Sequence, residues 1–403
     1  MRASLGTFLS FSIFGLAAGC SGQAAAPPDA GQAPVDTGTV HADAAAEPDA
    51  GTPEADAGFA PDALPGDAVD NPLNPTWTST GSLPPAAQPS DLWGAIVVEI
   101  PGEHRFFVLG GNTYPTGGTV ADAYFYNVDT GVWTPVTAPG NPSPRYCHCA
   151  AYLPEQHAIF VNGGRDDNNP SPPGGFIFDL GTETWSRSTG RSPNGVIGCN
   201  AVWMPSFPGG GRVILFGGDS FAGVSNQTWA FDPGTKTYEQ LMPATVPPSR
   251  RDSHLAYDPG ENGNGRVLMW SGSDSVYPPD QAHQRDDLWS FDGNDWTTIP
   301  QGMDRPVARR YAASAFDTSR REWIIFGGTK ETNDFDDLWR FDMKTDTWQK
   351  LDAVVAGGGD LPAARGFPLF GYDADTRNYV LYGGYSQPAY RNLKSGWRLV
   401  LRP

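Results

Sequence analysis

The sequence is poor in cysteine, histidine and positive charge. Its 403 residues include 4 cysteines, 6 histidines and 27 lysines and arginines against 45 acidic residues, for a formal net charge of −18. A protein that binds nucleic acid needs a basic face to meet the phosphates, so this balance argues against such a partner. The acidity is uneven, because the stretch from Ser21 to Thr76 holds ten acidic residues and no lysine or arginine.

Motifs of enzymes and a helical period are also missing. There is no G-x-G-x-x-G after an expected strand, no P-loop, no H-E-x-x-H and no G-x-S-x-G. The chain is instead rich in glycine (49), proline (38), tryptophan (13) and phenylalanine (21), which suits many short strands joined by turns. We therefore expect an all-β protein without catalytic residues, a metal or a cofactor.

The N-terminus has the pattern of an export signal. Arg2 is followed by an apolar run that is too short to span a bilayer but suits the core of a signal peptide. The run ends in L-A-A-G-C, which resembles the lipobox of bacterial lipoproteins. The resemblance implies a signal peptide over residues 1–19, lipidation of Cys20 and an exported bacterial lipoprotein at the outer membrane or cell surface. Its membrane contact would be the N-terminal lipid alone.

Residues 20–74 predict a disordered tether rich in alanine, aspartate and proline. Pro-Asp-Ala-Gly occurs at 28–31 and 48–51, and Ala-Asp-Ala-Gly at 55–58. Such a segment has too little apolar surface to offset the entropy of ordering the chain. It resembles the linkers of surface lipoproteins.

A unit of about 50 residues repeats through the rest of the chain. A short apolar strand ends at a pair of small residues, a loop follows, and then come a strand with spaced aromatics and a further aromatic. The pairs are Gly110-Gly111, Gly163-Gly164, Gly217-Gly218, Gly272-Ser273, Gly327-Gly328 and Gly383-Gly384. The stretch from Trp323 to Trp348 is the fullest copy, and a period of this length with four strands predicts a β-propeller.

The repeat resembles the kelch repeat in its double glycine, its spaced aromatics and its later tryptophan. The resemblance implies a six-bladed kelch-type β-propeller over residues 75–403. The sixth copy lacks its last strand, whereas Trp77-Thr78-Ser79 matches the start of that strand in other copies. We therefore predict that a strand at about 75–80 completes the last blade and closes the ring.

An arginine precedes the first strand in most blades. By resemblance to the kelch family, these arginines surround one mouth of the central channel, together with two histidines. As ligand-binding candidates they are Arg145, His148, Arg250, Arg251, His254, Arg309, Arg310 and Arg365. One reading pairs the arginines with nearby acids and carbonyls as braces, and the other leaves several of them to bind an anion.

Three cysteines are disulfide candidates, since the context predicts an oxidising compartment. They are Cys147, Cys149 and Cys199, and a bridge between adjacent inner strands would leave one thiol over. On a regular strand Cys147 and Cys149 share a face and His148 points away, so the three could not hold one metal together.

Kelch propellers mostly bind partners through their loops. The resemblance therefore implies a monomeric, non-catalytic scaffold for a protein or carbohydrate partner. A sugar mutarotase or epimerase that uses the arginine-lined mouth is the alternative. A copper radical oxidase fits less well because it needs several histidines.

Overall fold

The computed structural model describes residues 74–81, 92–113, 117–166, 174–193, 197–220, 222–274, 283–389 and 391–402. The predicted signal peptide, the lipidation site Cys20 and the tether up to residue 73 lie outside these residues. In the described ranges all regular elements are β-strands. A search of the same ranges finds no helix that could span a membrane.

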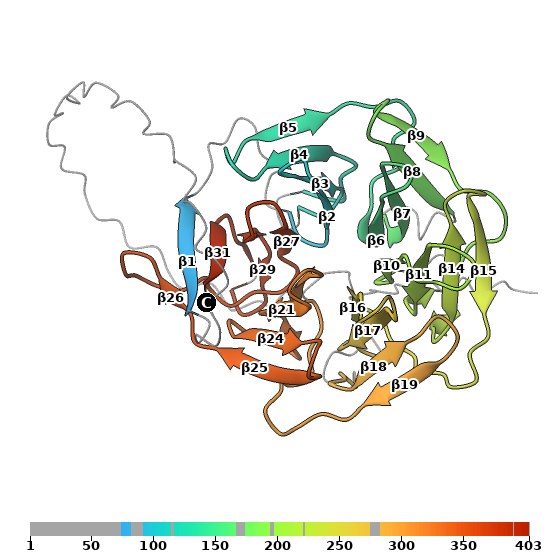
Figure 1. Ribbon diagram of the computed structural model, residues 1–403. Coiled ribbons are helices and arrows are strands. Elements are labelled where there is room, and N and C mark those ends of the chain that lie inside the picture. The colour runs from blue at the N-terminus through green and yellow to red at the C-terminus, as the bar shows by residue number, and fades with distance from the viewer. Residues whose placement is uncertain are drawn as a thin grey trace, which may run out of the picture. The chain divides into compact units, whose positions relative to one another are not determined.

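Six antiparallel sheets stand around a common centre as the blades of a propeller (Figure 1). Blade 1 comprises β2 (Ile96–Ile100), β3 (Arg105–Leu109), β4 (Ala123–Asn127) and β5 (Trp133–Val136). Blade 2 comprises β6 (Tyr146–Leu153), β7 (Ala158–Arg165), β8 (Gly175–Asp179) and β9 (Thr184–Arg187). Blade 3 comprises β10 (Asn200–Met204), β11 (Arg212–Phe216), β14 (Thr228–Asp232) and β15 (Thr237–Leu241).

The second half of the ring repeats this plan. Blade 4 comprises β16 (His254–Asp258), β17 (Arg266–Trp270), β18 (Leu288–Phe291) and β19 (Trp296–Ile299). Blade 5 comprises β20 (Ala313–Asp317), β21 (Glu322–Phe326), β24 (Leu338–Asp342) and β25 (Thr347–Leu351). Blade 6 comprises β27 (Leu369–Asp373), β28 (Asn378–Tyr382), β31 (Gly396–Arg402) and β1 (Asn74–Gly81). The predicted all-β, six-bladed propeller is confirmed.

Three short hairpins follow the second strands of blades 3, 5 and 6. They are β12 (Asp219–Ser220) with β13 (Gly223–Val224), β22 (Thr329–Lys330) with β23 (Asn333–Asp334), and β29 (Tyr385–Ser386) with β30 (Arg391–Asn392). The first strands β2, β6, β10, β16, β20 and β27 contact one another in sequence and form the inner wall of the ring.

The aromatic residues of the repeat pack between blades. Each of the six contacts between neighbouring blades has its own buried hydrophobic cluster. Between blades 4 and 5, Trp323 and Trp348 pack with Trp270, whose ring centroid lies 5.3 Å from that of Trp348. Burial of this apolar surface drives one blade onto the next, so no blade buries its faces alone.

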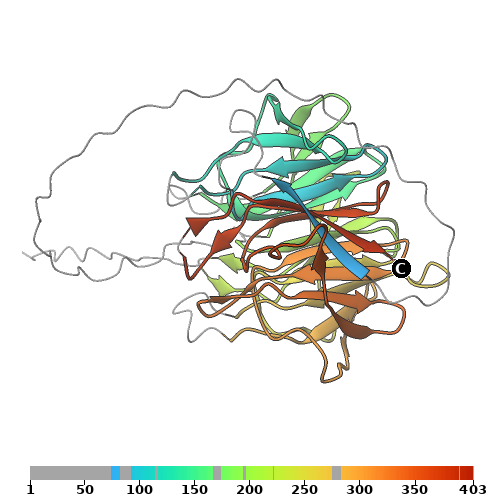
Figure 2. The ribbon, with the colours of Figure 1, turned by 90° about the vertical axis from the view of Figure 1, so that its left-hand side faces the viewer.

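The N-terminal strand β1 lies in the sixth blade. It pairs antiparallel with β31 from Asn74 opposite Arg402 to Gly81 opposite Gly396. Figure 2 shows β1, in blue, lying against the red strands at the end of the chain. On its other side β1 pairs in parallel with β26 (Val354–Val355), which follows blade 5. The outer edge of β1 is therefore partly covered.

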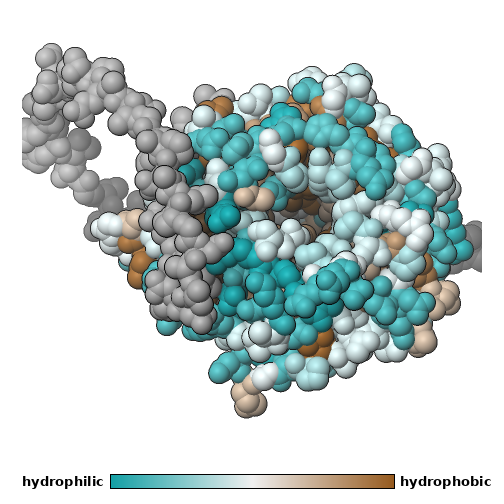
Figure 3. Space-filling model, in the orientation of Figure 1, coloured by the Kyte–Doolittle hydropathy of each residue, from teal (hydrophilic) through white to brown (hydrophobic). Residues whose placement is uncertain are grey.

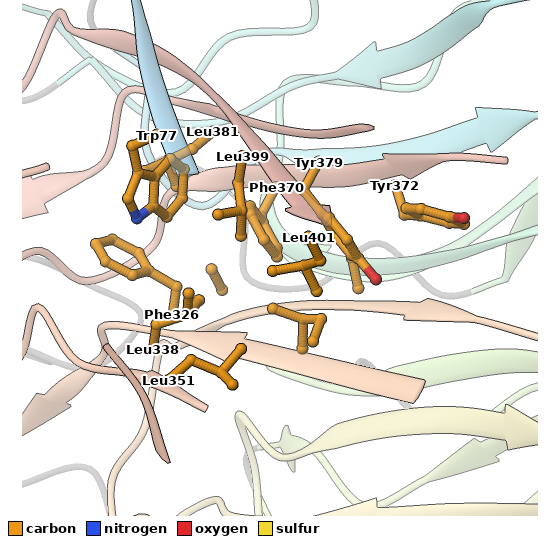
Figure 4. Close-up of a cluster of buried hydrophobic side chains, with 13 residues drawn as sticks. Trp77, Phe326, Leu338, Leu351, Phe370, Tyr372, Tyr379, Leu381, Leu399 and Leu401 are labelled. Carbon is orange, nitrogen blue, oxygen red and sulfur yellow. The ribbon is translucent and has the colours of Figure 1, made fainter. Parts of the chain in front are cut away.

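Trp77 anchors β1 to the fifth blade. Its side chain is 1% exposed and meets the ring of Phe326 edge-on, in a cluster that also contains Leu338 and Leu399 (Figure 4). The cluster joins residues that are more than 240 positions apart in the chain.

Replacing this tryptophan tests the closure. Trp77→Ala leaves a cavity between blades 5 and 6, and we expect the free energy of unfolding in urea to fall by about 3–5 kcal/mol. Met303→Ala, at a residue that is 94% exposed, should change it by less than about 0.5 kcal/mol. Equal stability of the two variants would contradict a structural role for β1.

Candidate binding site at the channel mouth

One end of the central channel is formed by two segments of each blade: the residues before the first strand and those after the second strand. We call this end the mouth. Isolated bridges join the two segments, for example Arg251 with Ser273 and Arg310 with Thr329. Most of the arginines predicted from the sequence lie in the first of these segments.

Four arginines hold the mouth together from inside the wall. Arg309 is fully buried and donates from Nε to the carbonyl of Val307 at 3.1 Å and from Nη1 to the carbonyl of Gly327 at 2.8 Å. The equivalent residues make the same two contacts in their own blades. They are Arg145, Arg250 and Arg365. We call these four the brace arginines.

The brace arginines also bind the neighbouring blade through their main chain. The carbonyl of Arg365 accepts a hydrogen bond from the N–H of Gly328 at 2.9 Å, and that of Arg145 accepts one from Gly111 at 2.8 Å. A Cβ on Gly327, whose φ is +66°, would lie 2.7 Å from the Arg365 carbonyl oxygen. The first glycine of the pair is therefore required by this close approach and by its positive φ.

The fourth blade corrects the predicted pairing of glycines. Ser271 and Gly272, and not Gly272 and Ser273, occupy the two positions, since Arg250 donates to the carbonyl of Ser271 and Gly272 donates to that of Arg309. Ser271 tolerates a φ of +74° there, and its hydroxyl donates to the Arg309 carbonyl.

Two aspartates that the sequence analysis missed complete the brace. Asp337 receives both terminal nitrogens of Arg309, and Asp287 receives those of Arg250 at 2.6 and 2.7 Å. Each aspartate also accepts from the indole of the tryptophan two residues later, at 2.7 Å. The motif D-L-W recurs at the start of the third strand in blades 4 and 5, and this repetition could have identified both aspartates.

Arg145 and Arg365 lack such a carboxylate partner among the described residues. Burial lowers the pKa of each to about 10, and Arg187 adds to this at Arg145. Both therefore remain charged at neutral pH, with carbonyl oxygens and one serine hydroxyl each as their acceptors. All four arginines therefore act as braces, one of the two roles considered from the sequence. Their guanidinium groups are buried and already hydrogen-bonded within the protein, so they are not free to bind an anion.

A ring of equivalent residues narrows the channel just inside the mouth. One residue per blade has a φ between 52° and 67°: Gly94, Cys147, Gly198, Asp252, Tyr311 and Phe367. Hydrogen bonds of 2.8 Å link several of them directly, such as Cys147 N–H to the Gly94 carbonyl and Phe367 N–H to the Tyr311 carbonyl. All six residues line the channel. Two of them are glycines, and the other four have side chains that narrow the channel.

Arg251 and Arg310 stand next to this ring and differ in their partners. Arg251 is 2% exposed and pairs through Nε with Asp252 at 2.8 Å and through Nη1 with Asp219 at 3.1 Å. Arg310 is 5% exposed, and its Nε and Nη1 have no hydrogen-bond partner in the described part of the chain. Its guanidinium lies 4.7 Å from the ring centroid of Tyr311.

The opposite side of the mouth is aromatic. Trp93 contacts the rings of Tyr146, Phe367 and Tyr385, and Phe367 stacks on Tyr311 with centroids 3.6 Å apart. Burial raises the pKa of Tyr311 to about 12, so the phenol keeps its proton. The mouth thus combines an aromatic side from blades 6, 1 and 2 with a charged side from blades 3, 4 and 5.

The channel contains an open cavity of about 160 Å³, which is lined in part by the residues of this ring. Figure 3 shows a hollow at the centre of the ring with hydrophobic residues inside it. His148 and His254 line the cavity with Asp252 and Tyr311. Burial and then the neighbouring Arg309 lower the pKa of His254 to about 4, and burial with Arg145 holds that of His148 well below its usual value. Both imidazoles are therefore neutral at physiological pH.

Cys149 and Cys199 form a disulfide between the inner strands of blades 2 and 3, with Cα atoms 5.6 Å apart. This is a bridge between adjacent inner strands, as predicted. The expected leftover thiol is not found, since the described residues contain no free cysteine. The expectation that Cys147 and Cys149 share a face is also wrong, because Cys147 has a φ of 52° and interrupts the strand alternation.

Comparison with known proteins gives the same repeat. The family model described as the KLHDC2/KLHL20/DRC7 Kelch-repeats domain matches residues 95–292. The chain is similar to Kelch domain-containing protein 3 of Bos taurus, at 27% identity over 326 residues that cover 74% of this chain and 79% of the relative. It is also similar to Kelch domain-containing protein 10 of Xenopus tropicalis, at 23% identity over 57% of this chain and 55% of the relative.

Another relative carries a different domain name. Acyl-CoA-binding domain-containing protein 5 of Arabidopsis thaliana is 24% identical over 292 residues, which cover 69% of this chain and 42% of that protein. All three relatives are eukaryotic proteins.

The brace makes a sharp prediction about stability. Arg309→Met removes the cation that pairs with Asp337 and the donor to the Gly327 carbonyl, and we expect a loss of about 3–5 kcal/mol in the free energy of unfolding. Arg191→Met, at an exposed arginine, should lose less than about 0.5 kcal/mol. Urea titration followed by tryptophan fluorescence measures both, and a loss at position 309 no larger than at 191 would refute the brace.

Proposed function

We propose that this six-bladed kelch-repeat propeller is a non-catalytic binding module that holds a protein partner at its mouth. The observation that carries the proposal is Arg310, an arginine that is 95% buried and lacks partners for two guanidinium nitrogens within the described residues. An unpaired buried charge lowers the stability of a protein. A carboxylate from a partner would supply the missing acceptors with the geometry that a guanidinium fork prefers.

The surroundings of Arg310 suit a protein segment. Aromatic residues and arginine are the side chains that contribute most to protein–protein affinity when they lie in an enclosed site. Here Tyr311 adjoins Arg310 and Phe367 stacks on Tyr311, and Trp93 and Tyr385 extend the aromatic side. We therefore expect a partner segment with an acidic group next to an apolar side chain.

The sugar-isomerase alternative is not favoured by this arrangement. Such an enzyme would need an unpaired acid and base beside an anion-binding arginine. Two carboxylates at the mouth, Asp219 and Asp252, are ion-paired with Arg251.

Binding at the mouth can be tested with a displayed library of random peptides. Peptides selected on the full-length chain should contain an acidic residue and should bind Arg310→Gln at least about tenfold more weakly, as expected for the loss of a buried charged contact. Arg191→Gln serves as the control and should bind like the wild type. Peptides that bind all three proteins equally would contradict the site, and sugar binding on a glycan array that depends on Arg310 would favour a carbohydrate partner.

Stability separates this role from a structural one. The Nε and Nη1 of Arg310 lack hydrogen-bond partners among the described residues, whereas the guanidinium of Arg309 donates four hydrogen bonds. Arg310→Gln should therefore leave the melting temperature unchanged or raise it, whereas Arg309→Met lowers it. A large fall in melting temperature for Arg310→Gln would identify Arg310 as another brace.

We further propose that the chain is exported and anchored by a lipid on Cys20, the first residue of the predicted tether over residues 20–74. Support comes from the sequence alone, in the L-A-A-G-C motif after the apolar run. In a bacterial host, Cys20→Ser should move the protein from the detergent-soluble membrane fraction to the aqueous fraction. An unchanged distribution on immunoblots would refute lipidation.

A further inference from the structure

The face opposite the mouth carries the turns between first and second strands. At the contact between blades 6 and 1, two of these turns interlock. Gly102 N–H donates to the carboxylate of Asp375 at 2.9 Å, and Ala374 N–H donates to that of Glu99 at 2.7 Å. His104, in the blade 1 turn, lies beside Asp373, the last residue of β27.

The same two positions at the contact between blades 4 and 5 hold an arginine and an aspartate. Arg321 precedes β21 as His104 precedes β3, and both have a positive φ. Asp258 ends β16 as Asp373 ends β27. Arg321 donates to both oxygens of Asp258, at 2.7 and 3.2 Å, and Arg266 adds a further ion pair at 3.0 Å. The buried aspartate is thus fully neutralised there.

The shorter imidazole of His104 leaves Asp373 without this neutralisation. Asp373 is 1% exposed, and within the described residues its Oδ1 has no hydrogen-bond partner. Its Oδ2 accepts hydrogen bonds from the N–H and the hydroxyl of Thr376, which are uncharged donors. The Nδ1 of His104 lies 3.9 Å from Asp373 Oδ2 and 3.7 Å from Asp129 Oδ2, which is too far for a hydrogen bond. No arginine or lysine of the described residues forms an ion pair with Asp373, Asp375 or Glu99.

The 3.9 Å between His104 Nδ1 and Asp373 Oδ2 is a separation that one ion could bridge. Ligand atoms about 2.1 Å from one ion are roughly 3.4 Å apart in a tetrahedral site and up to roughly 4.2 Å apart across a wider one. One ligand atom each from His104, Asp373 and Asp375 lies within 4.8 Å of the other two. Asp373, whose carboxylate is buried and has one oxygen without a hydrogen-bond partner among the described residues, belongs to this group.

We infer that His104, Asp373 and Asp375 form a binding site for a divalent transition-metal ion of the Zn²⁺ class. An imidazole nitrogen with carboxylate oxygens is a ligand set that suits Zn²⁺, whereas Ca²⁺ and Mg²⁺ prefer oxygen ligands alone. At the contact between blades 6 and 1, an ion from solution would take the role that Arg321 has at the contact between blades 4 and 5. It goes beyond the sequence analysis, which predicted no metal.

The ion would join the last blade to the first. His104 belongs to blade 1, whereas Asp373 and Asp375 belong to blade 6, so the ligands come from parts of the chain about 270 residues apart. Because such a site exists only in the folded ring, binding stabilises the folded state by mass action. The site lies on the opposite face from Arg310, so it does not depend on the proposed partner site.

Zinc binding by the full-length chain tests the inference, with a chromophoric chelator as competitor. We expect one ion per chain, a rise in melting temperature with Zn²⁺, and a loss of affinity of at least about tenfold in His104→Gln and in Asp375→Asn. His283→Gln is the matched control. His283 also pairs with an aspartate, at 3.2 Å, but is 83% exposed, and that variant should bind zinc like the wild type.

A second variant keeps the test sharp if a ligand deletion disturbs the fold. His104→Arg reproduces the arginine of blades 4 and 5, so it should abolish zinc binding and raise the melting temperature of the metal-free protein. Absence of saturable binding by the wild type, or unchanged affinity in both His104 variants, would overturn the site. A zinc-dependent rise in melting temperature of equal size in wild type and His104→Arg would overturn it as well.

Discussion

Four of the six blades are fastened to the blade before them through a buried arginine that works with both its side chain and its main chain. The guanidinium of Arg309 binds the carbonyl of Gly327 within blade 5, and the carbonyl of Arg309 receives the N–H of Gly272 from blade 4. One residue thus fixes the end of the second strand in its own blade and the position of that blade beside its neighbour. The glycine pair, the positive φ values and the order of the inner strands all conform to this arrangement.

Two kinds of interaction hold neighbouring blades together, and they lie at different distances from the axis of the ring. Near the axis, backbone hydrogen bonds between equivalent left-handed residues join several successive blades, as from Asp252 N–H to the Gly198 carbonyl. Farther out, apolar clusters such as that of Trp323 and Trp348 fill the space between sheets. The inner set is directional and fixes geometry, whereas the outer set supplies most of the favourable free energy.

The fold was predictable because its signals recur in phase. Glycine pairs and spaced aromatics at a nearly constant interval give the number of blades, and Trp77 in the sequence indicates the closing strand. The site was less predictable because function depends on departures from the repeat. Nothing in the sequence distinguishes Arg309, which pairs with Asp337, from Arg310, whose Nε and Nη1 lack hydrogen-bond partners in the described part of the chain. The distinction depends on where Asp337 lies in the fold. His104 and Asp373 are far apart in the chain, and only ring closure brings them together.

The placement of β1 sets the order in which the ring can form. This strand precedes every other element of the propeller in the chain, yet its main partner β31 follows all of them. During synthesis, β1 is the first strand to leave the ribosome. It cannot pair with β31 until the residues of all six blades have been made. Closure is therefore a late event that requires contacts of very long sequence separation, and such contacts form slowly. The sequence of β1, Asn74–Gly81, is well suited to this delay because most of its residues are polar or small. It can therefore remain extended in water without attracting other chains.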